Sequence, residues 1–89
     1  MKRIRITISG KVQGVFFRKN AHSKAVALGL SGWVRNLDNG GVMAEVQGEP
    51  FGVDQFVDWC RQGPDRARVT DVATEILPSR HERGFRIRY

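Results

Sequence analysis

The sequence has few of the residues that form covalent or metal-bound scaffolds. Its 89 residues include one cysteine, Cys60, and two histidines, His22 and His81. A single cysteine excludes a disulfide within the chain, so folding needs no oxidising compartment and we expect a cytoplasmic protein. The cysteine and the histidines lie far apart, without the paired spacing of metal ligands, so we expect no metal site.

Long apolar runs are lacking as well. No stretch approaches the roughly 20 apolar residues that a membrane-spanning helix needs. The start, Met1-Lys2-Arg3, leads into an alternating segment instead of the apolar block of a signal peptide. We therefore expect no membrane segment. The length suits one domain, residues 1–89, with a core of modest size.

Acidic residues are missing from residues 1–37, which carry eight lysines and arginines within a chain of net charge +6. The simplest interpretation is a well-solvated surface. A more specific one is an anionic ligand, either a nucleic acid or a small phosphate compound. Charge alone does not choose between these two ligands.

Hydrophobic periodicity predicts alternating strands and helices. The pattern indicates strands over residues 3–9, 32–36, 41–48, 67–76 and 85–89, and helices over 17–28 and from Pro50 to the residues before Gly63. Asn39-Gly40 predicts a type I′ hairpin between the second and third strands. A slip in the alternation near Asp71 predicts a bulge in the fourth strand.

The order of these elements is β-α-β-β-α-β plus a short fifth strand. Right-handed crossovers place both helices on one face of an antiparallel sheet and leave the other face to solvent. The sequence therefore predicts an α+β protein with a ferredoxin-like split β-α-β sandwich. This fold has many functions, so it does not decide one.

The turn between the first strand and the first helix is the first candidate site. Gly10 and Gly14 allow the chain to bend just before a helix N-terminus, where backbone N–H groups can converge on an anion. Arg18 falls in the first helical turn, where a cation is unfavourable unless an anion offsets it. We expect this turn to bind a phosphate or a carboxylate.

Two other functions are weaker on the residues. Cys60 and Arg66 have the Cys-x5-Arg spacing of cysteine-dependent phosphatases, but Cys60 lies on the apolar face of a helix, where a buried hydrophobe is the better interpretation. RNA-recognition domains share the fold, but the third strand here has no aromatic residue for base stacking.

Asn36 ends the second strand, and we expect it to lie near the mouth of the 13–18 loop.

Two ungapped runs then identify a family. They are ISGKVQGVFFR at residues 8–18 and GWVRNLDNGGV at residues 32–42, followed by Gly48. They resemble the first and second signatures of the acylphosphatases, and the order of the elements is similar over the whole chain. The resemblance implies hydrolysis of the carboxyl–phosphate bond of small acyl phosphates, with a carboxylate and inorganic phosphate as products.

The resemblance also implies roles for individual residues. Arg18 matches the arginine that binds the phosphoryl group, and Asn36 matches the asparagine that orients the attacking water. The implied phosphate-binding loop comprises Gln13, Gly14, Val15, Phe16, Phe17 and Arg18, mainly through its backbone. No metal, organic cofactor, nucleic acid or membrane partner is implied, and a monomer suffices. The alternative is a non-catalytic RNA- or anion-binding module on the same fold.

Overall fold

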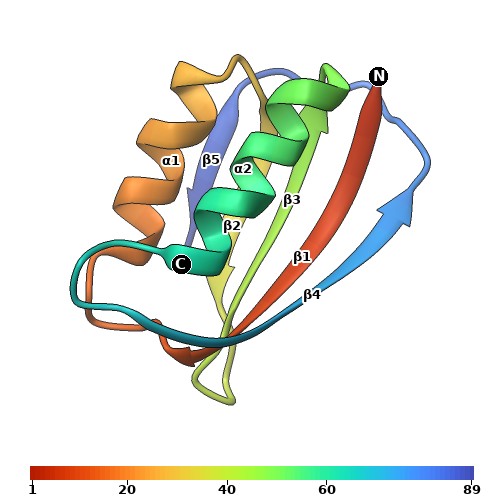
Figure 1. Cartoon of the computed structure of the whole chain (residues 1–89). Helices are drawn as coiled ribbons and strands as arrows, with labels where there is room; N and C mark the ends of the chain where they lie inside the picture. The colour runs from red at the N-terminus through yellow and green to blue at the C-terminus, as the bar shows by residue number, and fades with distance from the viewer.

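A five-stranded sheet with two helices on one of its faces forms the protein (Figure 1). The computed structural model describes all of residues 1–89. In chain order the elements are β1 (Lys2–Lys11), α1 (Phe17–Ala27), β2 (Ser31–Asn36), β3 (Val42–Gly48), α2 (Pro50–Gln62), β4 (Arg68–Leu77) and β5 (Phe85–Arg88). The predicted ferredoxin-like β-α-β-β-α-β order with a short fifth strand is confirmed.

The strand order across the sheet is β4-β1-β3-β2-β5. The first four strands pair antiparallel, as predicted, whereas β5 pairs parallel with β2. β4 and β5 therefore lie at opposite edges, and residues 78–84 carry the chain from one edge to the other (Figure 1). The fifth strand makes the sheet mixed and places the end of the chain beside α1.

Both helices bury the predicted apolar faces against the sheet. In α1 the buried residues are Phe17, Ala21 and Ala25; in α2 they are Gly52, Val53, Phe56, Val57 and Cys60. Pro50 opens α2 at a position where its missing N–H has no helical acceptor in any case. Gly29, with φ 70°, follows the end of α1. Neither helix has the length and apolar character that a membrane crossing requires.

The hairpin between β2 and β3 differs from the prediction. Phe16 is the only residue other than glycine with a positive φ, so Asn39 does not adopt the left-handed conformation that a type I′ turn needs. Instead the Gly40 N–H donates to the Leu37 carbonyl at 3.2 Å, and Gly40 alone takes a positive φ, 94°. Strand pairing stops at Asn36 and Val42, so the loop is longer than the two residues of a type I′ hairpin.

The predicted irregularity of β4 is confirmed. The pairing of β1 with β4 shifts between Ser9 and Gly10, whose partners are Asp71 and Val69. Thr70 is therefore an extra residue on the β4 side, as in a β-bulge. The shift lies just before β1 enters the loop that leads to α1.

The face of the sheet away from the helices is not simply solvent-exposed, contrary to the sequence prediction. Arg3 is 1% exposed and Glu45 6%. Residues 78–84 cover this end of the face. Gln47 Nε2 donates to the Arg80 carbonyl at 2.8 Å, and Arg3 Nη1 lies 2.8 Å from Glu82 Oε1. The polar alternation of β1 and β3 thus serves an ion network that holds the β4–β5 loop.

Glu45 is the centre of this network. Its Oε1 accepts a hydrogen bond from Arg3 Nη2 at 2.8 Å, and its Oε2 lies 3.0 Å from Arg5 Nη2. Burial opposes ionisation of Glu45, but the hydrogen bonds and charges of Arg3 and Arg5 outweigh it and lower the pKa of the carboxyl. A carboxyl with a lowered pKa stabilises the folded state above its unfolded pKa.

Replacing Glu45 with glutamine should therefore destabilise the protein in a pH-dependent way. We expect Glu45→Gln to lower the free energy of unfolding by about 2 kcal/mol at pH 7, because charge-assisted hydrogen bonds are lost. The difference should shrink as pH falls below the ordinary value of 4.5, because the carboxyl of the unfolded chain becomes protonated there, and it should vanish below the lowered pKa of the folded state. Urea unfolding at pH 7 and at pH 3 measures both values.

Glu75→Gln is the matched control, because the Glu75 side chain is 64% exposed and lies 3.5 Å from Arg5. Its effect should stay below about 0.5 kcal/mol at either pH. An equal loss of stability for Glu45→Gln at pH 7 and pH 3 would contradict the role given to its charge.

Candidate active site

The loop between β1 and α1 has an unusual backbone. Gly14 has φ 73°, and Phe16, the residue before the helix, has φ 63° and ψ 27°. A left-handed conformation costs a residue with a side chain about 1–2 kcal/mol. No side chain caps the start of α1. Strained, uncapped backbone of this kind is typical of a ligand-binding loop.

The amide groups of this loop have no partners within the chain. None of the N–H groups of residues 13–16 donates a hydrogen bond to a backbone or side-chain acceptor. Phe17 and Arg18 belong to the first helical turn, where amides have no helical acceptor. The loop and the start of α1 together therefore offer a row of free donors, which suits an anion.

Two side chains of the loop point elsewhere and hold its shape. Gln13 Nε2 donates to the Leu37 carbonyl at 2.7 Å and to the Gly41 carbonyl at 2.8 Å. Val15 is 5% exposed and packs in the core. Gln13 thus ties the loop to the β2–β3 hairpin, which places the loop close to the end of β2.

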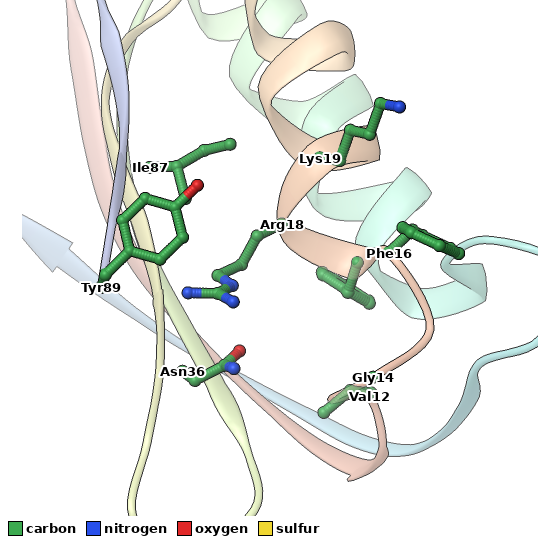
Figure 2. A pocket seen from close by; sticks show the side chains of 9 residues that line it. Val12, Gly14, Phe16, Arg18, Lys19, Asn36, Ile87 and Tyr89 are labelled. Atoms are coloured by element: carbon green, nitrogen blue, oxygen red, sulfur yellow. The ribbon is translucent and has the colours of Figure 1, made fainter.

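A cavity of about 280 Å³ lies in front of this loop. Its lining residues are Val12, Gly14, Phe16, Phe17, Arg18, Lys19, Asn36, Ile87 and Tyr89. Of the residues singled out from the sequence, the side chains of Arg18 and Asn36 point toward one another in this cavity (Figure 2). Gln13 and Val15 contribute no side chain to it.

Asn36 reaches the cavity because of the strand alternation in β2. Val34 is fully buried beneath the helices, and a two-residue step puts Asn36 on the same face at the end of the strand. Its side-chain amide forms no hydrogen bond within the chain. The Asn36 carbonyl and NH2 groups are therefore free to bind a water molecule or a ligand.

Arg18 is held by residues that the sequence reasoning missed. Its Nη1 donates to the Arg88 carbonyl at 3.2 Å, and its guanidinium carbon lies 4.7 Å from the centroid of the Tyr89 ring. The alternation of Phe85, Ile87 and Tyr89 was a usable signal, because it assigns all three to the face that carries the helices. Nothing in the sequence showed that β5 pairs with β2 and lies beside α1.

The cavity is cationic. Arg18 and Lys19 line it, no acidic residue does, and the first turn of α1 contains no acid. Lys19 points away from the space between Arg18 and Asn36 (Figure 2). A cation in the first helical turn is unfavourable by itself. An anion bound there would be stabilised both by the guanidinium of Arg18 and by the N–H groups at the positive end of the helix dipole.

The other candidate groups lie outside this cavity. Cys60 is fully buried in α2, and burial raises the pKa of its thiol far above the ordinary value. This agrees with the interpretation of Cys60 as a buried hydrophobe, because a buried neutral thiol is a poor nucleophile. His22 packs beside Phe85, with 6.0 Å between ring centroids, and His81 is exposed. No group of three His, Cys, Asp or Glu residues could hold a metal ion.

The third strand offers no platform for stacking RNA bases. On its outer face Met43 is half-buried, whereas Glu45 and Gln47 are buried and bonded to Arg3 and to the backbone of Arg80. None of these side chains is aromatic. The surface that RNA-recognition domains use for stacking is therefore occupied by the ion network.

Comparison with known proteins identifies the family. The acylphosphatase family model matches residues 4–87. An acylphosphatase of Rubrobacter xylanophilus is 51% identical over 98% of this chain and 80% of its own. Solved acylphosphatases of Bacillus subtilis (TM-score 0.96, 33% identity, all of both chains) and Coxiella burnetii (TM-score 0.94, 40% identity, 98% of this chain and 92% of that one) have the same fold. This chain, in which Arg18 and Asn36 line one cavity, therefore belongs to the acylphosphatase family of hydrolases.

Proposed function

We propose that Arg18, Asn36 and the amides of residues 13–18 carry out the acyl phosphate hydrolysis that membership of the family indicates. The observation that supports this is their convergence on one cavity, with the loop amides and the Asn36 side chain free of partners within the chain. The substrate class is a small acyl phosphate, and the products are a carboxylate and inorganic phosphate.

The loop amides and Arg18 bind the phosphoryl group. Backbone N–H groups at a helix N-terminus donate to phosphoryl oxygens, and the planar guanidinium of Arg18 donates two further charge-assisted bonds. The contacts of Arg18 with the Arg88 carbonyl and the Tyr89 ring restrict its motion. These donors are in place before the reaction, so they can stabilise charge on the equatorial oxygens without reorganising.

Asn36 orients the attacking water. Its carbonyl accepts a hydrogen bond from the water, which aims a lone pair of the water oxygen at phosphorus. A new P–O bond forms as the bond between phosphorus and the carboxylate oxygen breaks. The carboxylate leaves with the bonding electrons and, with a pKa of about 4, needs no general acid. The proton of the water passes to a phosphoryl oxygen of the substrate.

This mechanism uses no metal ion and no organic cofactor, because the donors that it needs belong to the chain. The remaining sequence predictions are part of the proposal: a cytoplasmic monomer that acts without nucleic acid. Light scattering of the purified protein would show the mass of one chain if the monomer is correct. A stable dimer would contradict that part of the proposal and leave the chemistry untouched.

The purified protein should release phosphate from acetyl phosphate and benzoyl phosphate, and EDTA should leave the rate unchanged. A phosphate monoester such as phenyl phosphate should react far more slowly, because its leaving group is a much stronger base and no general acid is present. Phosphate release followed over time measures all three. Decay of both acyl phosphates at their spontaneous rate would refute the proposed activity.

Arg18→Gln should abolish most of the affinity for phosphate. We expect competitive inhibition by inorganic phosphate to weaken at least about 100-fold, since two charge-assisted hydrogen bonds are lost. Arg61→Gln is the control, because Arg61 is an exposed arginine of α2 that does not line the cavity. Equal phosphate inhibition constants for wild type and Arg18→Gln would show that Arg18 does not bind the phosphoryl group.

Asn36→Ala should lower kcat by about 100- to 1000-fold, the range found when one oriented polar group is removed from an active site. Its inhibition constant for inorganic phosphate should stay within about twofold of wild type, because the phosphate donors remain. Steady-state kinetics with added phosphate gives both values. A large loss of phosphate affinity would show that Asn36 binds the phosphoryl group instead of the water.

A further inference from the structure

Trp33 is a large aromatic residue on the face of the sheet opposite the active-site cavity. Its neighbour Val34 is buried beneath the helices, so the alternation of β2 turns Trp33 to the other face. The Trp33 side chain is nevertheless buried, at 8% exposure, and it is not part of the core cluster between sheet and helices. Its burial there needs a separate reason.

The partner of Trp33 is Arg88. The guanidinium carbon of Arg88 lies 4.6 Å from the centroid of the Trp33 ring, which is a cation–π geometry. Arg88 forms no ion pair with an acid, and in the parallel pairing of β2 with β5 it stands opposite another cation, Arg35. Like charges directly opposite one another are unfavourable. The Trp33 ring therefore offers Arg88 a contact that Arg35 does not.

The backbone of Arg88 has a second contact, on the side of the cavity. Its carbonyl accepts the hydrogen bond from Arg18 Nη1, and the next residue, Tyr89, places its ring against the Arg18 guanidinium. β5 is a four-residue edge strand that pairs with β2 alone. Short edge segments near a terminus open readily unless side-chain contacts hold them.

We propose that Trp33 is a positioning residue for Arg18 and acts through Arg88. The stack of Trp33 on the Arg88 side chain fixes the end of β5, and so fixes the carbonyl and the ring that orient the Arg18 guanidinium. Trp33 touches neither substrate nor the reacting atoms. The inference rests on the proposed function in one respect only, namely that Arg18 is the group that binds phosphate.

Loss of the contact between Trp33 and Arg88 should weaken phosphate binding only because it frees the Arg18 guanidinium to move. A guanidinium that samples several orientations makes fewer simultaneous bonds to a phosphoryl group, so affinity for inorganic phosphate falls. A role in stability alone would lower the unfolding temperature and leave the phosphate affinity of the folded protein unchanged. The two roles therefore differ in a measurable quantity.

The test uses Trp33→Leu, Trp33→Phe and Arg88→Met, with phosphate affinity measured by titration of inorganic phosphate in a calorimeter. We expect Trp33→Leu and Arg88→Met to weaken binding about two- to fivefold, the scale of one cation–π contact with an exposed arginine, and Trp33→Phe, which keeps a ring, to weaken it less. The double variant Trp33→Leu/Arg88→Met should be no weaker than either single variant, because both remove the same contact.

Arg86→Met is the matched control. Arg86 lies two residues away on the same face of β5 and pairs with Trp33 in the strand register, but its carbonyl does not bind Arg18. Its phosphate affinity should equal that of wild type. An unchanged affinity in Arg88→Met overturns the proposal even if Trp33→Leu fails to fold, because Arg88 is an exposed residue whose removal leaves the core intact.

A second arm separates this inference from the proposed function. In the Arg18→Gln background, Trp33→Leu should cause no further loss of phosphate affinity, since the group that it positions is gone. The same loss in both backgrounds would show that Trp33 acts on something other than Arg18. The titration needs no turnover. A wild-type protein that binds phosphate through Arg18 but hydrolyses no acyl phosphate would therefore refute the activity and leave the positioning role open to this measurement.

Discussion

Backbone amides without partners are the constraint on which the rest of the site depends. The N–H groups of residues 13–16 have no acceptor within the chain, and the first turn of α1 adds more free donors. Such a loop does not keep its shape through its own hydrogen bonds, so other contacts must hold it. Gln13 does so through two carbonyls of the hairpin, and Val15 and Phe17 do so by burial in the core.

The same constraint explains the charges around the loop. Arg18 stands where the helix dipole disfavours a cation, and contacts from β5 hold it there. The arginines of β1 have a different role. Arg3 and Arg5 surround Glu45 on the far face of the sheet and fasten residues 78–84, which carry the chain across to β5. The loop held by the ion network therefore leads to the strand that orients Arg18.

Several parts of this structure were predictable from residues close together in the chain. The buried stripe of α1, the start of α2 at Pro50 and the bulge opposite Ser9 and Gly10 all follow from local periodicity or from one residue's backbone limits. The prediction of a type I′ turn was wrong because Asn39-Gly40 lies in a loop longer than two residues. The prediction of a solvent-exposed outer face was wrong because residues 78–84, more than thirty residues away in sequence, cover Glu45 and Gln47.

The sequence by itself determined the elements of the chain, the bend at Gly14 and, through two signature runs, the family. These features depend on neighbouring residues, so a linear reading reaches them. The sequence also led us to expect Asn36 near the 13–18 loop, but only the tertiary structure decided that β5 joins them at the same cavity. The strand order and the parallel pairing of β5 with β2 bring the Arg88 carbonyl and the Tyr89 ring to Arg18 from the other end of the chain. Such pairing is selected by the packing of the whole core, and no local pattern encodes it.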